Sequence, residues 1–125
     1  MKCFMIERTA DEESTHEWVR PDTGQKFLYQ SLEPGAMYYA PWLLCGDYPH
    51  GLSVHWQGLP AEERAKGPLI VKTPGGWWCI DRPSTSGSGW QRTGTAPNIT
   101  VAPSIFHDPP NGWHGWLHNG DLTPV

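Results

Sequence analysis

Three side chains near the ends of expected strands could support acid–base chemistry: Asp81, His107 and His114. Asp81 ends the run WWCID, His107 follows NITVAPSIF and precedes Asp108, and His114 opens the last apolar stretch after DPPNGW. Strand ends that meet at one rim of a small sheet are a common place for a site, and a carboxylate can orient an imidazole for proton transfer. The alternative is structural, with His114 donating to a backbone carbonyl and Asp81 capping a turn. The sequence leaves both interpretations open.

A second set could bind a metal ion. Cys45, His50, His55 and Cys79 offer two thiolates and two imidazoles, a donor set that suits zinc. The spacing Cys-x4-His-x4-His lacks the paired Cys-x2-Cys that makes such patterns specific, and a buried cysteine is more commonly a small hydrophobic residue. We therefore predict no cofactor and keep zinc as the alternative for these four residues.

The last fourteen residues, GWHGWLHNGDLTPV, predict a β-hairpin. Asn119-Gly120 favours a type I′ turn, in which both central residues have a positive φ. Such a turn sets His118 opposite Asp121, Leu117 opposite Leu122 and Trp116 opposite Thr123. His114 and His118 then lie about 13 Å apart at about 3.3 Å per residue. Two ligands of one zinc ion, with bonds of about 2.1 Å, cannot be that far apart.

Eight tryptophans are more than the core of a 125-residue chain needs. In WWCI the two rings point to opposite faces of a strand, so at least one of Trp77 and Trp78 belongs to the core. We expect others to be exposed, and large exposed apolar patches mark binding sites. The candidate binding residues are Trp113, His114, Trp116 and His118.

The overall composition excludes several classes of protein. The net charge is −4 and there is no run of Lys or Arg, which makes nucleic acid an unlikely partner. No stretch approaches the roughly 20 apolar residues of a membrane span, so we expect no membrane partner. The start, MKCFMIERTADEES, does not resemble a signal peptide, and three widely spaced cysteines do not form a disulfide framework. We expect a cytoplasmic location with reduced thiols.

The elements that must position these residues are short strands. With 14 Gly and 13 Pro, the chain is interrupted too often for long helices. We predict one all-β domain over residues 1–125, a small β-sandwich or half-open barrel of six to eight short antiparallel strands with at most one short helix. The helix candidate is LPAEERAKGP, LSVHW is assigned as a strand, and residues 8–26 are a polar excursion. The remaining strand candidates are KCFMI, KFLYQSL, AMYYA, LIVKT, WWCID, WQRTG and NITVAPSIF.

Residues 34–125 resemble a family of small phage- and prophage-encoded proteins of unknown function. The resemblance rests on APW, PLIVKTPGGWWCID, TGTAPNITVAPSI and WHGWLHNGDLT, with PSI and HGWL-NG the most specific parts. The family pattern falls on Trp78, Asp81, Trp90, Gly94, Pro97, Ser104, Ile105, His114, Gly115 and Gly120. Members often carry the label ammonia monooxygenase, which we reject because that enzyme is a copper membrane protein and this chain has no membrane span and no convincing copper site.

The resemblance implies a phage accessory protein in the cytoplasm of a bacterial host, with virion association as a further option. The leading hypothesis is a non-catalytic protein that binds a host or phage protein, or a small ligand, through an aromatic surface. One alternative is a small hydrolase, with or without a metal, that uses Asp81, His107 and His114. The other is a homo-oligomeric virion component, because an exposed aromatic face or edge strand can also support self-association.

Overall fold

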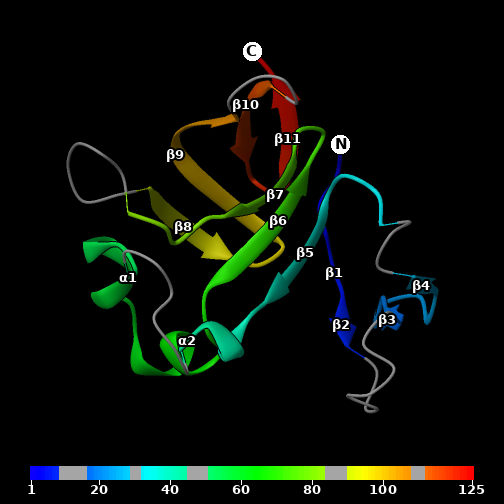
Figure 1. The fold of residues 1–125 in the computed structure, drawn as a ribbon, viewed down its shortest axis with the longest axis horizontal. Helices are drawn as coiled ribbons and strands as arrows, with labels where there is room; N and C mark the ends of the chain where they lie inside the picture. Colours follow the sequence, from blue (N-terminus) through cyan, green and yellow to red (C-terminus); the bar gives the residue numbers. More distant parts are fainter. Residues whose placement is uncertain (9–16, 29–31, 45–50, 84–89, 108–111) are drawn as a thin grey trace.

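The computed structural model describes residues 1–8, 17–28, 32–44, 51–83, 90–107 and 112–125, and shows three β-sheets with short helices at one side (Figure 1). The all-β prediction is confirmed, and these residues hold more strands than the six to eight expected. In chain order the strands are β1 (Phe4–Met5), β2 (Glu7–Arg8), β3 (Glu17–Val19), β4 (Lys26–Leu28), β5 (Ala36–Tyr39), β6 (Leu69–Thr73), β7 (Gly76–Cys79), β8 (Gln91–Thr95), β9 (Asn98–His107), β10 (Trp113–His118) and β11 (Asp121–Pro124).

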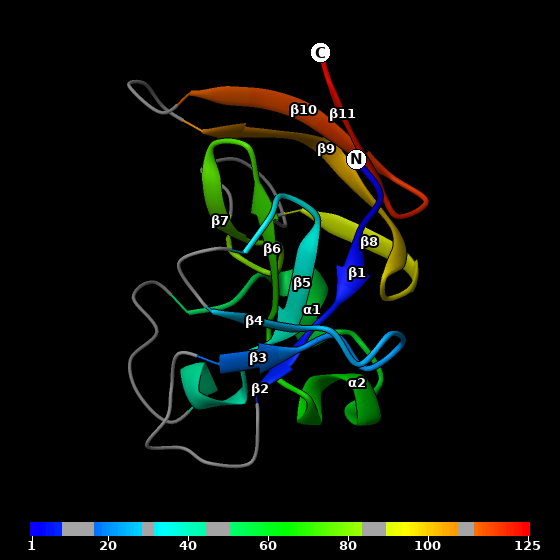
Figure 2. The same cartoon turned by 90° about the vertical axis from the view of Figure 1, so that its right-hand side faces the viewer.

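The central sheet has the order β1-β5-β6-β7 and is antiparallel except for the parallel pair β1 and β5. It packs between the other two sheets (Figure 2). Successive side chains of a strand point to opposite faces, so its buried residues divide between two cores. Leu69, Val71 and Trp78 belong to the core shared with strands β9–β11, which we call the main core. Ile70 and Tyr38 belong to the core shared with β3, which we call the second core.

The second sheet, in the order β11-β10-β9-β8, ends in the hairpin that the sequence predicts. Asn119 has φ 46° and Gly120 has φ 75°, as a type I′ turn requires. The predicted register is confirmed by the pairs His118 with Asp121, Leu117 with Leu122 and Trp116 with Thr123. Leu117 and Leu122 are buried, whereas the paired residues His118 and Asp121 are exposed.

The third sheet, β2-β3-β4, lies largely within the segment expected to be a polar excursion. Its Trp18 is only 2% exposed and packs against Tyr38 of the central sheet, with ring centroids 4.7 Å apart. Phe27 of β4 also stacks on Phe4, with ring centroids 6.1 Å apart. Two aromatic side chains thus attach this sheet to the body of the protein.

Two short α-helices, α1 (Val54–Gln57) and α2 (Ala61–Ala65), and the 3₁₀ turn η3 (Pro41–Leu44) complete the fold. Helix α2 lies within the predicted helix. Helix α1 corrects the strand assigned to LSVHW, because the Ser53 hydroxyl accepts a hydrogen bond from the Trp56 N–H at 3.0 Å and starts a helical turn there. Among the residues described, no helix is long and apolar enough to cross a membrane.

Candidate functional site

An aromatic cleft of about 590 Å³ opens between the third sheet, the edge of the central sheet and η3. Its most exposed ring is Trp42, which is 41% exposed and stacks on Tyr38 with ring centroids 5.9 Å apart. The cleft is lined by Met5, Ile6, Glu7, Arg8, Trp18, Pro21, Tyr38, Tyr39, Pro41, Trp42 and Lys66. Aromatic and apolar side chains predominate, with charged groups of both signs among them.

The position of Trp42 depends on a glycine at the end of α2. Gly67 has φ +90°, and a Cβ atom there would lie 2.5 Å from the Cα atom of Pro41. Only a residue without a side chain allows η3 to approach so closely and also adopts this backbone conformation readily. The Ala40 N–H also donates to the Pro68 carbonyl at 2.8 Å. The two contacts hold η3 against the chain that leads into β6.

Two cations lie against the aromatic walls. The Arg8 guanidinium lies 4.3 Å from the centroid of the Trp42 ring and 5.7 Å from that of Trp18. The Lys66 ammonium lies 5.4 Å from the Tyr39 ring centroid and 3.3 Å from a Glu63 carboxylate oxygen. Glu63 therefore balances the charge of Lys66.

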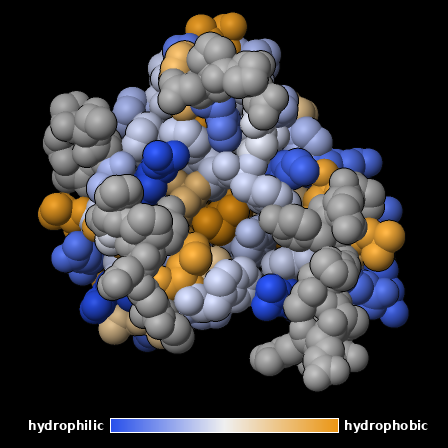
Figure 3. Space-filling view, viewed as in Figure 1, coloured by the Kyte–Doolittle hydropathy of each residue, from blue (hydrophilic) through white to orange (hydrophobic). Residues whose placement is uncertain are grey.

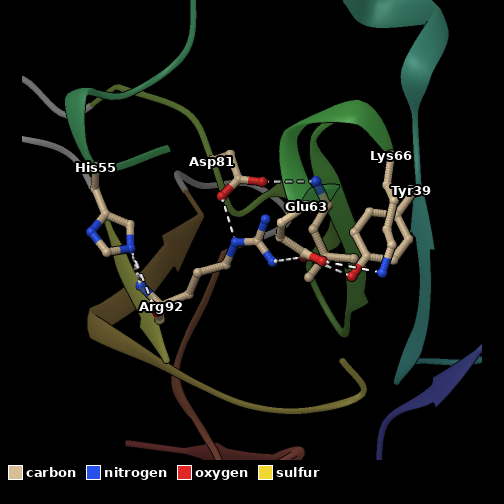
Figure 4. Close-up of polar contacts among 7 residues, drawn as sticks. Tyr39, His55, Glu63, Lys66, Asp81 and Arg92 are labelled. Carbon is tan, nitrogen blue, oxygen red and sulfur yellow. Dashed lines mark hydrogen bonds and ion pairs between the residues drawn. The ribbon is translucent and has the colours of Figure 1, made fainter. Parts of the chain in front are cut away.

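A chain of polar groups begins at Tyr39, which lines the cleft, and runs through the partly buried Glu63 to the buried Arg92 and Asp81 (Figure 4). The Tyr39 hydroxyl donates to Glu63 at 2.8 Å, and the same carboxylate oxygen accepts from Arg92 Nη1 at 2.8 Å. Arg92 Nε donates to Asp81 at 2.9 Å. The second Asp81 oxygen accepts from the Leu69 N–H at 2.9 Å. These bonds join β5, α2, β6 and β8 around one guanidinium.

Burial and ion pairing act in opposite directions on this network. Burial raises the pKa of Asp81 above its usual range, against the attraction of the Arg92 guanidinium. Burial also acts to raise the pKa of Glu63, but hydrogen bonds from Tyr39, Arg92 and Lys66 bring it below its usual range. Burial and the bond to Glu63 raise the pKa of Tyr39 to about 12. The Tyr39 hydroxyl therefore stays protonated as a donor at neutral pH.

The structure does not bring the three candidate catalytic residues together. Asp81 bonds the backbone of Leu69 at one end of β6, while His107 Nε2 lies 2.8 Å from the Thr73 hydroxyl at the other end. Leu69 and Thr73 are four residue steps apart along β6, which corresponds to about 13 Å. His114 pairs with Phe106, the neighbour of His107, so the two imidazoles lie on opposite faces of the second sheet. Asp108 lies outside the described residues.

His114 instead lies beside Ser104, with Ser104 Oγ 2.7 Å from His114 Nε2. Both residues lie on the outer face of the second sheet, where the hydrogen bond is exposed to solvent. Among the contacts that the structure describes, no carboxylate orients this imidazole. The His114 ring also packs against Phe106, with ring centroids 5.3 Å apart. The described contacts of the pair therefore lack the third member that a hydrolytic triad uses.

Of the four predicted binding residues, His114, Trp116 and His118 are exposed along one face of β10. Trp116 is 48% exposed. Trp113 instead packs against the main core and covers Gly115, where any side chain would collide with the Trp113 ring. Exposed aromatic rings are therefore present on this sheet, whereas the concave aromatic site lies at Trp42. On the face in Figure 3, hydrophobic residues form one group near the centre and further groups at the edges, with hydrophilic residues between them.

The candidate zinc ligands divide between described and undescribed parts of the chain. Cys45 and His50 lie outside the described residues. His55 Nε2 accepts a hydrogen bond from the Arg92 backbone N–H at 3.1 Å, and Cys79 packs at the second core. In the described ranges no three His, Cys, Asp or Glu side chains are grouped so as to hold a metal ion.

Sequence reasoning did not identify Arg8, Trp42, Glu63 or Arg92 as site residues. Trp42 lies in the APW stretch that the resemblance quotes, but no role was assigned to it. The cleft that contains Trp42 and Arg8 combines short segments from four separate parts of the chain. Glu63 and Arg92 come together only through the fold, in α2 and β8. The single available signal was the excess of tryptophan over the needs of one core.

Comparison with protein families, curated proteins and solved structures finds no match to this chain.

Proposed function

We propose that this chain is a non-catalytic phage or prophage accessory protein that binds a small ligand in the aromatic cleft. The observation that carries the proposal is the cleft itself, a concavity of about 590 Å³ in which the half-exposed Trp42 ring stacks on Tyr38. Pockets for small molecules commonly measure about 300–1,000 Å³ and are lined mainly by apolar and aromatic groups with a few polar ones. The resemblance of residues 34–125 to phage-encoded proteins supplies the biological context.

The placement of the titratable groups favours binding over hydrolysis. Asp81 is fully buried and accepts hydrogen bonds from Arg92 and Leu69, so its carboxylate is engaged in the interior. His107 and His114 lie on different faces of a sheet and cannot act on one substrate bond together. The hydrolase hypothesis needs all three at one place.

A small ligand fits the cleft better than a protein surface does. Stable protein interfaces bury about 800 Å² on each partner and are broad. The outer face of β9 and β10, where Phe106 and Trp116 are exposed, contributes no residue to the cleft and is the alternative surface for a protein partner. Ligand binding in the cleft and protein binding on the outer face of β9 and β10 therefore predict different effects of mutation. The variants Trp42→Ala and Trp116→Ala distinguish them.

The test uses the neutral fluorescent probe N-phenyl-1-naphthylamine, whose emission rises in an apolar environment. We expect it to bind the protein, and Trp42→Ala to raise its dissociation constant about tenfold, the effect of about 1.4 kcal/mol of lost aromatic contact. Trp116→Ala is the matched control, because Trp116 is exposed to a similar degree (48% against 41%) and lies outside the cleft. Equal dissociation constants for Trp42→Ala and the unmodified protein would refute the proposal.

A further inference from the structure

We propose that the ligand of the aromatic cleft carries an oxyanion group, such as a carboxylate, phosphate or sulfate, and that Arg8 binds it. This inference rests on the proposed function, because it specifies the chemistry of a ligand in the same cleft. The ligand would combine a flat apolar body, which contacts Trp42 and Tyr38, with one anionic group at the Arg8 side.

The geometry of Arg8 carries the argument. A guanidinium that stacks on an aromatic ring uses its face, and its N–H groups remain at the edge of the plane. Arg8 lies 4.3 Å from the Trp42 ring centroid and also near Trp18, its cross-strand partner in the pair of β2 with β3. Two aromatic contacts restrict the side chain before any ligand binds. Less conformational entropy is then lost when its fork of donors binds an oxyanion.

The charges around Arg8 leave it available. Within the described residues no carboxylate lies within ion-pair distance of its guanidinium, whereas Arg92 and Lys66 both pair with Glu63. Glu7 also lines the cleft, but it precedes Arg8 in β2. Neighbours in a strand point to opposite faces, so the Glu7 carboxylate and the guanidinium diverge. The cleft therefore presents one stacked cation whose donors are not already occupied by those carboxylates.

The acidic residues Asp11, Glu12 and Glu13 follow Arg8 in the sequence and lie outside the described residues. A carboxylate from this run bound to Arg8 would compete with an anionic ligand. In that case Arg8→Gln would leave the dissociation constant of the anionic probe unchanged in the experiment below.

The experiment compares two probes that differ by one anionic group. 8-Anilinonaphthalene-1-sulfonate has the ring system of N-phenyl-1-naphthylamine with an added sulfonate. Both dissociation constants are measured for the unmodified protein, Arg8→Gln and Arg82→Gln. Arg82 is the matched control, since it stacks on Trp78 at 4.5 Å and does not line the cleft.

We expect Arg8→Gln to weaken binding of the sulfonate about five- to tenfold and binding of the neutral probe less than twofold, since a charge-assisted contact is lost only from the anion. Arg82→Gln should change neither. If Arg8→Gln changes both probes equally, or neither, the oxyanion inference is overturned. The binding proposal then stands if Trp42→Ala still weakens both probes, and it fails if Trp42→Ala affects neither.

Discussion

Replacing Asp81 with alanine tests whether the buried ion pair holds the sheets and α2 together. The carboxylate is fully buried, and the side chain of Arg92 is only 4% exposed. Arg92 Nε and the Leu69 N–H each donate to an Asp81 oxygen at 2.9 Å. Removing the Asp81 carboxylate leaves both donors without this acceptor. Arg92 keeps its bond to Glu63, so the guanidinium retains one of its two carboxylates.

The expected loss of stability follows from these contacts. Breaking a buried ion pair on one side costs about 3–5 kcal/mol, because the remaining charge stays buried without its partner. The partial compensation from Glu63 places Asp81→Ala at the lower end, about 3 kcal/mol. The double variant Asp81→Ala/Arg92→Met removes the stranded charge as well. We expect it to lose at least about 1 kcal/mol less than the sum of the single variants.

The assay is urea unfolding followed by tryptophan fluorescence, with the slope of each transition compared to confirm that only stability changed. Asp22→Ala is the matched control, because Asp22 also pairs with an arginine, Arg20, at 2.7 Å but on the surface. Its unfolding midpoint should stay at that of the unmodified protein. A loss below about 1 kcal/mol for Asp81→Ala, or strict additivity in the double variant, would refute the reasoning.

Two further predictions concern packing and pH. Gly115→Ala should destabilise the protein by about 1–3 kcal/mol in the same assay, because a Cβ there meets the Trp113 ring and lies 2.5 Å from the Thr123 carbonyl oxygen. Gly58→Ala, whose Cβ would be 3.5 Å from its nearest neighbour, should be tolerated, and equal losses for the two variants would contradict this explanation. The pKa of Glu63 is lowered in the folded chain from its ordinary value of 4.5, so its stabilisation is present above that pH and is lost as the pH falls through the lower folded value. The free energy of unfolding should therefore decrease less steeply below about pH 4.5 in Glu63→Gln than in the unmodified protein, and parallel pH profiles would exclude this contribution of Glu63.

Local chemistry in the sequence was enough to determine the C-terminal hairpin. Asn119 and Gly120 both adopt a positive φ, and a two-residue turn leaves a single register for the strands that it joins. Period-2 alternation likewise predicted that Trp77 and Trp78 point to opposite faces of the sheet, but only the structure shows that Trp78 is the one in the main core. The all-β class followed from glycine and proline, which interrupt helices wherever they recur.

The candidate site was decided by the tertiary structure. The sequence placed Asp81 and His107 at strand ends, whereas β7 ends at Cys79, two residues before Asp81. The topology sets Asp81 and His107 at opposite ends of β6, and Asp81 pairs with Arg92 of β8. The cleft brings together Arg8 and Trp42, which are far apart in the chain and have no spacing relationship in the sequence. Turn type and alternation depend on neighbours in sequence, and they can be predicted from it. Which aromatic rings and charges meet depends on how the three sheets pack, and that arrangement leaves no pattern in any one segment.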